Sequence, residues 1–323
     1  MILFAFLVAT AVVITRLGDL FAVIMLAGIY SLISASLFVI MDAADVAFTE
    51  AAVGAGVSTL LLLKTLTLTE RHESYPARKG WLALTIVTVT GALLVYGTWD
   101  MPQFGSALAP AQQHVAPRYL ETSLIETGSP NVVTAILASY RGFDTLGELF
   151  VIFIAGIGVL VLLESRQPAA LRAPAQPAMQ QHLILRIVAK MLIPMIMAFA
   201  LYVQFHGEYG PGGGFQAGVI FAAAVILYAI LFGPAAVRRV FDHRVMRILS
   251  ALGVILFGGT GIAALLTGGT FLEYTTLAND PVTAQRIGIL LVELGVGITV
   301  AAVMIFVFCE FDERSPTLPQ EPH

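Results

Sequence analysis

The feature that most constrains this chain is a series of apolar runs, most of them long enough to cross a lipid bilayer. A helix rises 1.5 Å per residue, so about 20 apolar residues span the hydrocarbon core. We identify nine candidate spans, at residues 1–15, 18–40, 46–69, 81–99, 143–163, 183–205, 215–233, 245–267 and 285–308. The first run lacks the basic start of a signal peptide and is expected to be a retained, short helix. The sequence therefore predicts an all-α, polytopic helical membrane protein.

Composition supports this class and excludes several others. The chain is 58% hydrophobic and 12% charged, whereas charged residues make up about 25% of soluble domains. A net charge of -4 with no basic stripe gives no support for nucleic-acid binding. A single cysteine, Cys309, excludes an intrachain disulfide and an iron–sulfur cluster held by this chain alone. We expect no cofactor and no metal site.

Lysine and arginine in the connecting segments predict the orientation, because cytoplasmic loops are enriched in both. Alternate segments form two sets, which hold eleven and three of these residues. The larger set is Arg16, Arg71, Arg78, Lys79, Arg166, Arg172, Arg238, Arg239, Arg244, Arg247 and Arg314. The smaller set is Arg118, Arg141 and Arg286. We therefore expect the N-terminus outside and the C-terminus in the cytoplasm.

Two connecting segments stand out by composition and length. Residues 164–181 are rich in Pro, Ala and Gln and predict a cytoplasmic linker between five spans and a four-span unit. The outside segment from Asp100 to Arg141 is long, and Tyr119–Thr127 within it is expected to form a short helix at the membrane interface. No internal repeat is evident, which argues against the inverted repeats of many autonomous transporters.

Ionisable side chains inside the spans are the candidate functional residues, because a charge at mid-bilayer costs ~2.5–3.5 kcal/mol. Glu50 and Lys64 lie fourteen residues apart in the third span, which at about 100° per residue places them on one stripe. One interpretation makes them two stations of a protonatable path. The alternative is that Lys64 snorkels to the interface. Asp42 and Asp45 border this span and are expected to act as helix caps.

The fifth and ninth spans carry further carboxylates. Asp144 and Glu148 are four residues apart on one helix face, so close carboxylates there would share a proton. Alternatively, Asp144 caps the helix or pairs with Arg141, and Glu148 lies in the interfacial zone. Glu293 has no cation beside it in the sequence and is either a coupling residue or a structural hydrogen-bond partner across helices.

The densest local signal is the glycine-rich segment Gln204–Gly218, QFHGEYGPGGGFQAG. Its GGGFQA formally fits a dinucleotide fingerprint, but a membrane helix precedes it, so we reject that interpretation. Glycines after a proline permit positive φ and close backbone approach, which predicts a buried re-entrant turn. The turn consists of Pro211, Gly212, Gly213, Gly214 and Phe215. Gly214 and Gly218 form a small-xxx-small face, and His206 or Glu208 is a candidate surface proton group.

Three stretches carry a family resemblance. FHGEYGPGGGFQAGVIFAAAVIL resembles the signature of the B-type subunits of Mrp-type (Mnh/Mrp) multisubunit Na⁺/H⁺ antiporters. DAADVAFTEAAVGAG is similar to the D-type module of membrane-bound hydrogenases, and ETGSPNVVTAILASYRGFDTLGE to the E-type module. Both modules also occur at the C-terminal end of the large A-type antiporter subunit. The resemblance implies a D-type module at 1–70, an E-type module at 71–163, the linker at 164–181, a B-type domain at 182–311 and a cytoplasmic tail at 312–323.

The resemblance also implies a function. It suggests a non-enzymatic subunit of a monovalent cation (Na⁺)/proton antiporter in the cytoplasmic (inner) membrane of a prokaryote, with Glu50 and Glu148 in the ion-translocation machinery. The implied partners are the large antiporter-like A-type and D-type subunits, the small C-, E-, F- and G-type subunits, Na⁺, H⁺ and the lipid bilayer. The alternative is the membrane arm of a complex-I-related, redox-driven ion pump such as a membrane-bound hydrogenase. A self-sufficient transporter is disfavoured by the missing repeat.

Overall fold

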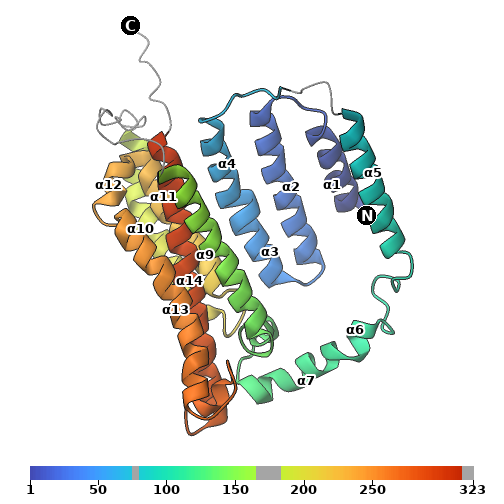
Figure 1. Ribbon diagram of the computed structural model, residues 1–323, viewed down its shortest axis with the longest axis vertical. Coiled ribbons are helices and arrows are strands. Elements are labelled where there is room, and N and C mark those ends of the chain that lie inside the picture. The colour runs from blue at the N-terminus through green and yellow to red at the C-terminus, as the bar shows by residue number, and fades with distance from the viewer. Residues whose placement is uncertain (75–79, 165–182, 315–323) are drawn as a thin grey trace.

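The computed structural model describes residues 1–74, 80–164 and 183–314, and this part of the chain is helical apart from turns and one isolated bridge between Asp19 and His72. The predicted linker at 164–181 lies outside the described residues except for Glu164, as do residues 315–323 of the predicted tail. The N-terminal helices form one layer, and the later helices form a bundle beside it (Figure 1). The layer consists of α1 (Ile2–Ile14), α2 (Leu20–Ile40), α3 (Ala44–Glu50), the π-helix η1 (Ala51–Ser58) and α4 (Thr59–Leu66).

Eight spans of the described chain are long and apolar enough to cross a membrane. The ninth expected span, α1, has only 13 residues, or about 20 Å of helix, and counts as a shorter apolar helix. It ends at the polar segment Arg16–Asp19, where the Asp19 carboxylate caps α2 by accepting a hydrogen bond from the Phe21 N–H at 3.0 Å. The orientation of the spans stays a prediction.

The third span is not a uniform α-helix. Its middle, η1, is π-helical and contains Gly54 and Gly56. In a π-helix the hydrogen bonds run from i to i+5, so each turn holds more residues than an α-turn. The 100° count that placed Glu50 and Lys64 on one stripe therefore does not apply. Lys64 instead forms an ion pair with Asp312 at the end of the last helix.

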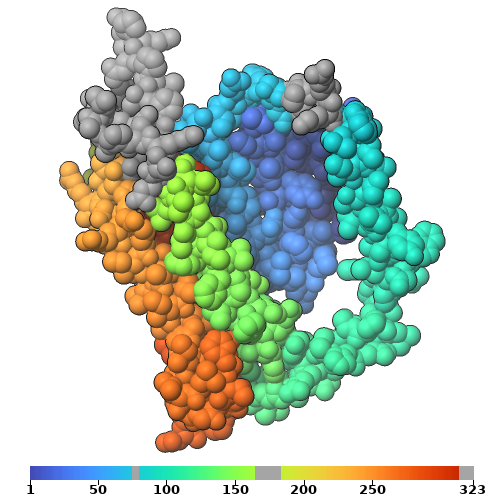
Figure 2. All heavy atoms as spheres, viewed as in Figure 1, coloured from blue at the N-terminus to red at the C-terminus, as the bar shows by residue number. Residues whose placement is uncertain are grey.

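A long connection leads from the layer to the bundle. The helix α5 (Gly80–Gly97) contains no buried residue and stands on the far side of the layer (Figure 1). Figure 2 shows an open gap between the layer and the segment that follows α5. The short helix expected at Tyr119–Thr127 is part of α7, whose C-cap Gly128 has φ of 72°. The connecting helices are α6 (Pro110–Gln113), α7 (Val115–Thr127), α8 (Val132–Ala135) and the π-helix η3 (Ile136–Tyr140).

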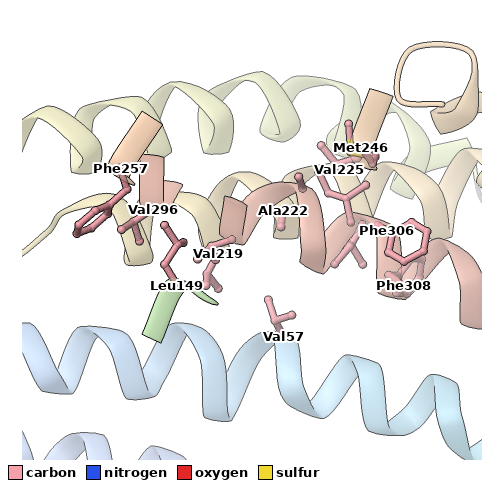
Figure 3. Packing of buried hydrophobic residues seen from close by; sticks show 14 of the residues in the cluster. Val57, Leu149, Val219, Ala222, Val225, Met246, Phe257, Val296, Phe306 and Phe308 are labelled. Carbon is pink, nitrogen blue, oxygen red and sulfur yellow. The ribbon is translucent and has the colours of Figure 1, made fainter. Parts of the chain in front are cut away.

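The bundle contains the main core. Figure 3 shows Leu149, Val219, Phe257 and Val296 meeting from different helices of the bundle, with Val57 of η1 reaching toward them. Val57 is 2% exposed, so the layer and the bundle share this core. The bundle consists of α9 (Gly142–Glu164), α10 (Leu183–His206), α11 (Gly214–Phe232), α12 (Pro234–Arg238), α13 (His243–Leu266), the 3-10 turn η5 (Tyr274–Thr276) and α14 (Pro281–Arg314).

Candidate functional site

The glycine-rich turn joins α10 to α11 and folds back onto α10. The Gly213 N–H donates to the Val203 carbonyl at 3.1 Å. Gly213 has φ of 122°, a backbone conformation that disfavours any side chain. A Cβ atom placed at Gly207 would lie 2.6 Å from Gly213 Cα. Gly212, Gly213 and Gly214 are buried and Pro211 is exposed, so the turn is compact because its glycines let two backbone segments touch.

The loop before α8 holds this turn in place. The Asn131 side-chain amide donates to the Gly207 carbonyl at 3.1 Å and to the Gly210 carbonyl at 2.9 Å. The Thr134 hydroxyl donates to the same Gly207 carbonyl at 2.7 Å. Asn131 also caps α8, because its side-chain oxygen accepts from the Val133 N–H at 2.9 Å. One side chain therefore positions both a helix start and a turn from a distant part of the chain.

Helix α11 packs closely on α14 through its glycines. A Cβ atom at Gly214 would lie 2.0 Å from the Glu293 carbonyl oxygen, and one at Gly218 would lie 2.7 Å from the Gly297 carbonyl oxygen. Such distances are far below van der Waals contact, so only glycine fits at either position. The small-xxx-small face expected from the sequence thus faces α14. This contact brings Glu293 beside the glycine-rich turn.

A cavity of about 330 Å³ lies between the layer and the bundle, next to the turn. Three carboxylates reach it from three different helices, α3, α9 and α14. Its wall is otherwise mainly apolar, with hydroxyl and amide groups near the carboxylates. The polar side chains of the lining are Asp45, Thr49, Thr134, Thr145, Glu148, Gln216 and Glu293. The Gln216 amide donates to the Thr49 hydroxyl at 2.9 Å across the cavity wall. The space beside the carboxylate, hydroxyl and amide groups is large enough to hold water molecules.

Asp45 is tied to the turn, and the expectation that it caps a helix is wrong. Its carboxylate accepts from the Gly212 N–H at 3.0 Å and from the Asn131 amide at 3.5 Å. The residue before α3 is Ala43, which makes no side-chain cap. Asp42 does not cap the helix either, and it has φ of 60° in the turn after α2. Both donors to Asp45 come from distant segments, so local sequence could not reveal them.

Glu148 and Glu293 are the other two carboxylates of the cavity. Glu148 is exposed in the isolated chain, at the mouth of the cavity, whereas Glu293 is half-buried. Among the described side chains of residues 1–74, 80–163 and 183–312, neither has a hydrogen-bond or ion-pair partner. Glu293 also lies within reach of the like charges of Asp45 and Glu208. Both groups are therefore available to a proton, a cation or water.

Glu50 and Lys64 lie away from the cavity. A Cβ atom at Gly54 would lie 2.4 Å from the Ser31 hydroxyl oxygen and 2.8 Å from a Glu50 carboxylate oxygen. The Glu50 carboxylate therefore occupies the space beside Gly54, on the side of α2. Lys64 and its partner Asp312 are each 20% exposed, which favours a structural ion pair over free snorkelling.

Asp144 and His206 are also outside the cavity lining. Asp144 pairs with Arg141 at 2.5 Å, and both side chains are exposed. The structure thus supports the alternative in which Arg141 neutralises Asp144. With this counter-charge, the Asp144 carboxylate does not have to share a proton with Glu148. His206 stacks on Tyr202 with ring centroids 4.9 Å apart. Glu208 forms an ion pair with Arg286, whose guanidinium also donates to the Tyr209 hydroxyl at 2.9 Å.

Three residues of the site were not selected from the sequence as functional: Asp45, Asn131 and Gln216. Asn131 follows Pro130 and precedes an apolar run, which is an N-cap signal. Gln216 lies within the glycine-rich motif itself. The sequence thus contained a cap signal at Asn131 and the glycine-rich motif. That both segments donate hydrogen bonds to Asp45 depends on the tertiary structure.

Comparisons with known families cover nearly the whole chain. The family described as a domain related to the MnhB subunit of Na⁺/H⁺ antiporter matches residues 184–306. The MbhD and MbhE families, which are the D and E components of MBH, match residues 5–71 and 82–181. The putative antiporter protein mnhB2 of Staphylococcus aureus (strain Newman) is 33% identical over 133 residues, which cover 40% of this chain and 92% of that protein.

Two longer proteins match more than nine tenths of the chain. A Rhizobium meliloti (strain 1021) protein, described as a probable A/B component of a K⁺/H⁺ antiporter, is 26% identical over 326 residues, covering 93% of this chain and 32% of its own length. A chain in the structure of the Mrp complex from Dietzia sp. DQ12-45-1b matches 99% of this chain with a TM-score of 0.79 and 27% identity. The match covers 35% of the Dietzia chain, so the present chain spans about a third of both relatives. The chain belongs to the Mrp/Mnh antiporter subunit family, with an MnhB domain behind MBH D- and E-type modules.

Proposed function

We propose that this chain is a membrane subunit of a monovalent cation/proton antiporter complex and that its carboxylate-lined cavity takes part in ion translocation. Membership of the Mrp/Mnh family supports the first part. The same family membership makes the large antiporter-like A-type and D-type subunits the expected neighbours. The small C-, E-, F- and G-type subunits complete the proposed complex in a prokaryotic cytoplasmic membrane, with Na⁺ as the exported cation.

The observation that carries the second part is the meeting of Asp45, Glu148 and Glu293 at one cavity. Ionised carboxylates within a membrane are costly unless a counter-charge neutralises them. A proton or a monovalent cation can do so, and oxygen ligands suit a hard cation. Glu148 at the mouth would exchange its proton with a neighbouring subunit. Water in the cavity would then pass charge to Glu293 beside the turn.

The other predicted residues fit around this path. Glu50 follows Thr49 of the cavity lining but lies on the α2 side, next to Gly54. We propose it as a second protonatable station, reached from α2. Lys64 is given a structural role, because it is paired with Asp312.

Neutral replacements of the cavity carboxylates test the proposal in the assembled complex. We expect Glu148→Gln and Glu293→Gln each to lower antiport at least about tenfold, because an amide takes up neither a proton nor a cation. The measurement is dye fluorescence that reports the pH gradient in membrane vesicles, with Na⁺ and with K⁺ added. Asp144→Asn is the matched control, since it removes a carboxylate from the same helix, one turn away and outside the cavity.

Wild-type antiport in both glutamine variants, with normal complex assembly, would rule out the cavity as the translocation site. Glu50→Gln is expected to abolish antiport as well. Loss in Glu50→Gln together with full activity in Glu148→Gln would instead move the path to the α2 side of the layer. Expression of this chain alone is expected to give no Na⁺ tolerance.

A second function has a specific observation in its favour. Two of the matched families, MbhD and MbhE, are components of MBH, which supports the membrane arm of a redox-driven ion pump. The protein composition of the purified complex separates the two functions. Iron–sulfur or hydrogenase components would support the pump, and antiporter components alone would support the antiporter.

A further inference from the structure

A cluster of cations lies at the start of α10, next to the end of α11. The Arg186 guanidinium carbon lies 5.2 Å from the centre of the Phe232 ring, and the Lys190 ammonium lies 5.6 Å from it. The two cations are four residues apart on α10 and therefore share one helix face. The Phe232 ring also contacts Tyr228, with ring centroids 4.7 Å apart. The cluster is thus fixed to a packed aromatic pair of α11.

The charge of this cluster is not balanced by the protein that the structure describes. Neither Arg186 nor Lys190 forms an ion pair with the side chains that the structure describes, which are those of residues 1–74, 80–163 and 183–312. The Arg186 Nε–H is buried there without a hydrogen-bond partner. An unsatisfied buried donor on a charged group is unfavourable. Some acceptor from outside this part of the chain is therefore expected to complete the site.

The position of the cluster restricts the acceptor. Arg186 and Lys190 lie in the first turns of a span, Leu183–His206, and Phe232 is the last residue of the next span, Gly214–Phe232. Arg186 and Phe232 thus lie near the ends of two adjacent spans, close to the level of the lipid headgroups, and Lys190 lies one turn further along α10. Arg238 and Arg239 follow closely, at the end of α12. The Lys and Arg distribution predicts this end to be cytoplasmic, where anionic lipids are enriched in many membranes.

We propose that Arg186, Lys190 and Phe232 form a binding site for the phosphate of an anionic phospholipid, whose acyl chains lie along α10. The guanidinium provides directed hydrogen bonds to phosphate oxygens, and the ammonium provides a second positive charge. The ring keeps both cations in position before the lipid arrives. The exposed apolar side chains of α10 that would contact the acyl chains include Leu183, Ile187 and Met191.

A lipid titration of the purified, complete complex tests this site. Native mass spectrometry would follow the binding of short-chain phosphatidylglycerol and, separately, phosphatidylcholine. The double variant Arg186→Gln/Lys190→Gln is expected to bind phosphatidylglycerol about 25-fold more weakly, since each cation near the surface contributes roughly a fivefold gain. Its binding of phosphatidylcholine is expected to be unchanged. Phe232→Leu, which keeps both cations, is expected to weaken phosphatidylglycerol binding by a smaller factor of about five.

The matched control is the double variant Arg16→Gln/Arg244→Gln. It removes the same charge from two exposed positions on the side predicted to be cytoplasmic, and it should bind phosphatidylglycerol within twofold of wild type. Three results would overturn the proposal. The first is unchanged phosphatidylglycerol binding in Arg186→Gln/Lys190→Gln, and the second is an equal loss of binding in the control variant. The third is that glycerol phosphate displaces bound phosphatidylglycerol as effectively as added phosphatidylglycerol does. None of these results depends on antiport.

Discussion

At the scale of single residues, Asn131 combines three distinct roles. Its side chain caps α8, donates to two carbonyls of the glycine-rich turn and contacts the Asp45 carboxylate. It is 8% exposed, so water cannot easily replace these partners. A buried amide that satisfies several backbone groups fixes a local conformation more strongly than any one of its hydrogen bonds would.

Asn131→Asp separates these roles. The aspartate keeps an oxygen for the α8 cap but loses the amide donor and faces Asp45 with a like charge. We expect a destabilisation of about 1–3 kcal/mol, because the Gly210 carbonyl loses the Asn131 amide donor and the Gly207 carbonyl keeps only the Thr134 hydroxyl. The midpoint of thermal inactivation of the purified complex is the measurement. Asn279→Asp, at an exposed loop position, serves as the control and should change stability by less than about 0.5 kcal/mol.

Asp19 gives a pH-dependent prediction at the same scale. The Arg71 guanidinium beside it lowers the pKa of the Asp19 carboxyl from 3.8 to about 2. Because the pKa is depressed in the folded state, the ion pair stabilises the fold above pH 3.8 and this contribution is lost as the pH falls to about 2. Hydrogen-exchange protection of the Leu20 and Glu73 amides, which bridge to Arg71 and Gly18, should decrease over that range. In Asp19→Asn this decrease in protection should be absent. The same decrease in the variant as in the wild-type protein would contradict the assignment.

At the scale of elements, the contact between α11 and α14 depends on backbone proximity. Gly214, Gly218 and Gly297 let the two helices approach until main-chain atoms touch. Glu293 lies on the α14 side of this contact. The position of the Glu293 carboxylate in the cavity therefore depends on how closely the two helices pack, in addition to the rotamer of its side chain.

Gly214→Ala tests this dependence. The added Cβ atom would lie 2.0 Å from the Glu293 carbonyl oxygen, so α11 and α14 must move apart at a cost of about 1–3 kcal/mol. We expect a lower thermal midpoint and reduced antiport from the displaced carboxylate. Gly258→Ala on α13 is the control, because no atom lies within 4 Å of its Cβ position. There, alanine should be neutral or stabilising by up to about 1 kcal/mol, and equal effects of both substitutions would contradict the packing argument.

At the scale of the whole molecule, the layer α1–α4 is attached to the bundle at a few points. One is Val57 in the shared core (Figure 3). Another is the ion pair between Lys64 of α4 and Asp312 of α14. The cavity lies between the same two parts, so its shape depends on these attachments.

The ion pair can be examined by breaking it and then replacing it. Lys64→Met leaves Asp312 with an unpaired charge at a partly buried site and should lower the thermal midpoint of the complex. Adding Asp312→Leu should restore most of the loss, because an apolar pair avoids the cost of desolvating charges. If the thermal midpoint of the double variant did not recover, the charges of Lys64 and Asp312 would be required there, and a contact between α4 and α14 would not be sufficient.

Much of the helical plan could be predicted from sequence, because hydropathy over about 20 residues is a local property. The end of α7 and the glycine-rich turn were also predictable, since glycine permits the positive φ observed at Gly128 and Gly213. The stripe expected from Glu50 to Lys64 assumed α-helical geometry throughout, and the π-helix η1 between them breaks that geometry. Asp45 was misassigned because its donors, Asn131 and Gly212, lie 86 and 167 residues away.

The sequence by itself determined that this chain is a helical membrane protein and which family it resembles, since span length, composition and short motifs are read locally. Only the tertiary structure decided which carboxylates meet. Asp45, Glu148 and Glu293 share one cavity because glycines let α11 approach α14 and because Asn131 ties the turn to the start of α3. Such proximity depends on contacts between distant segments, which no local pattern of residues encodes.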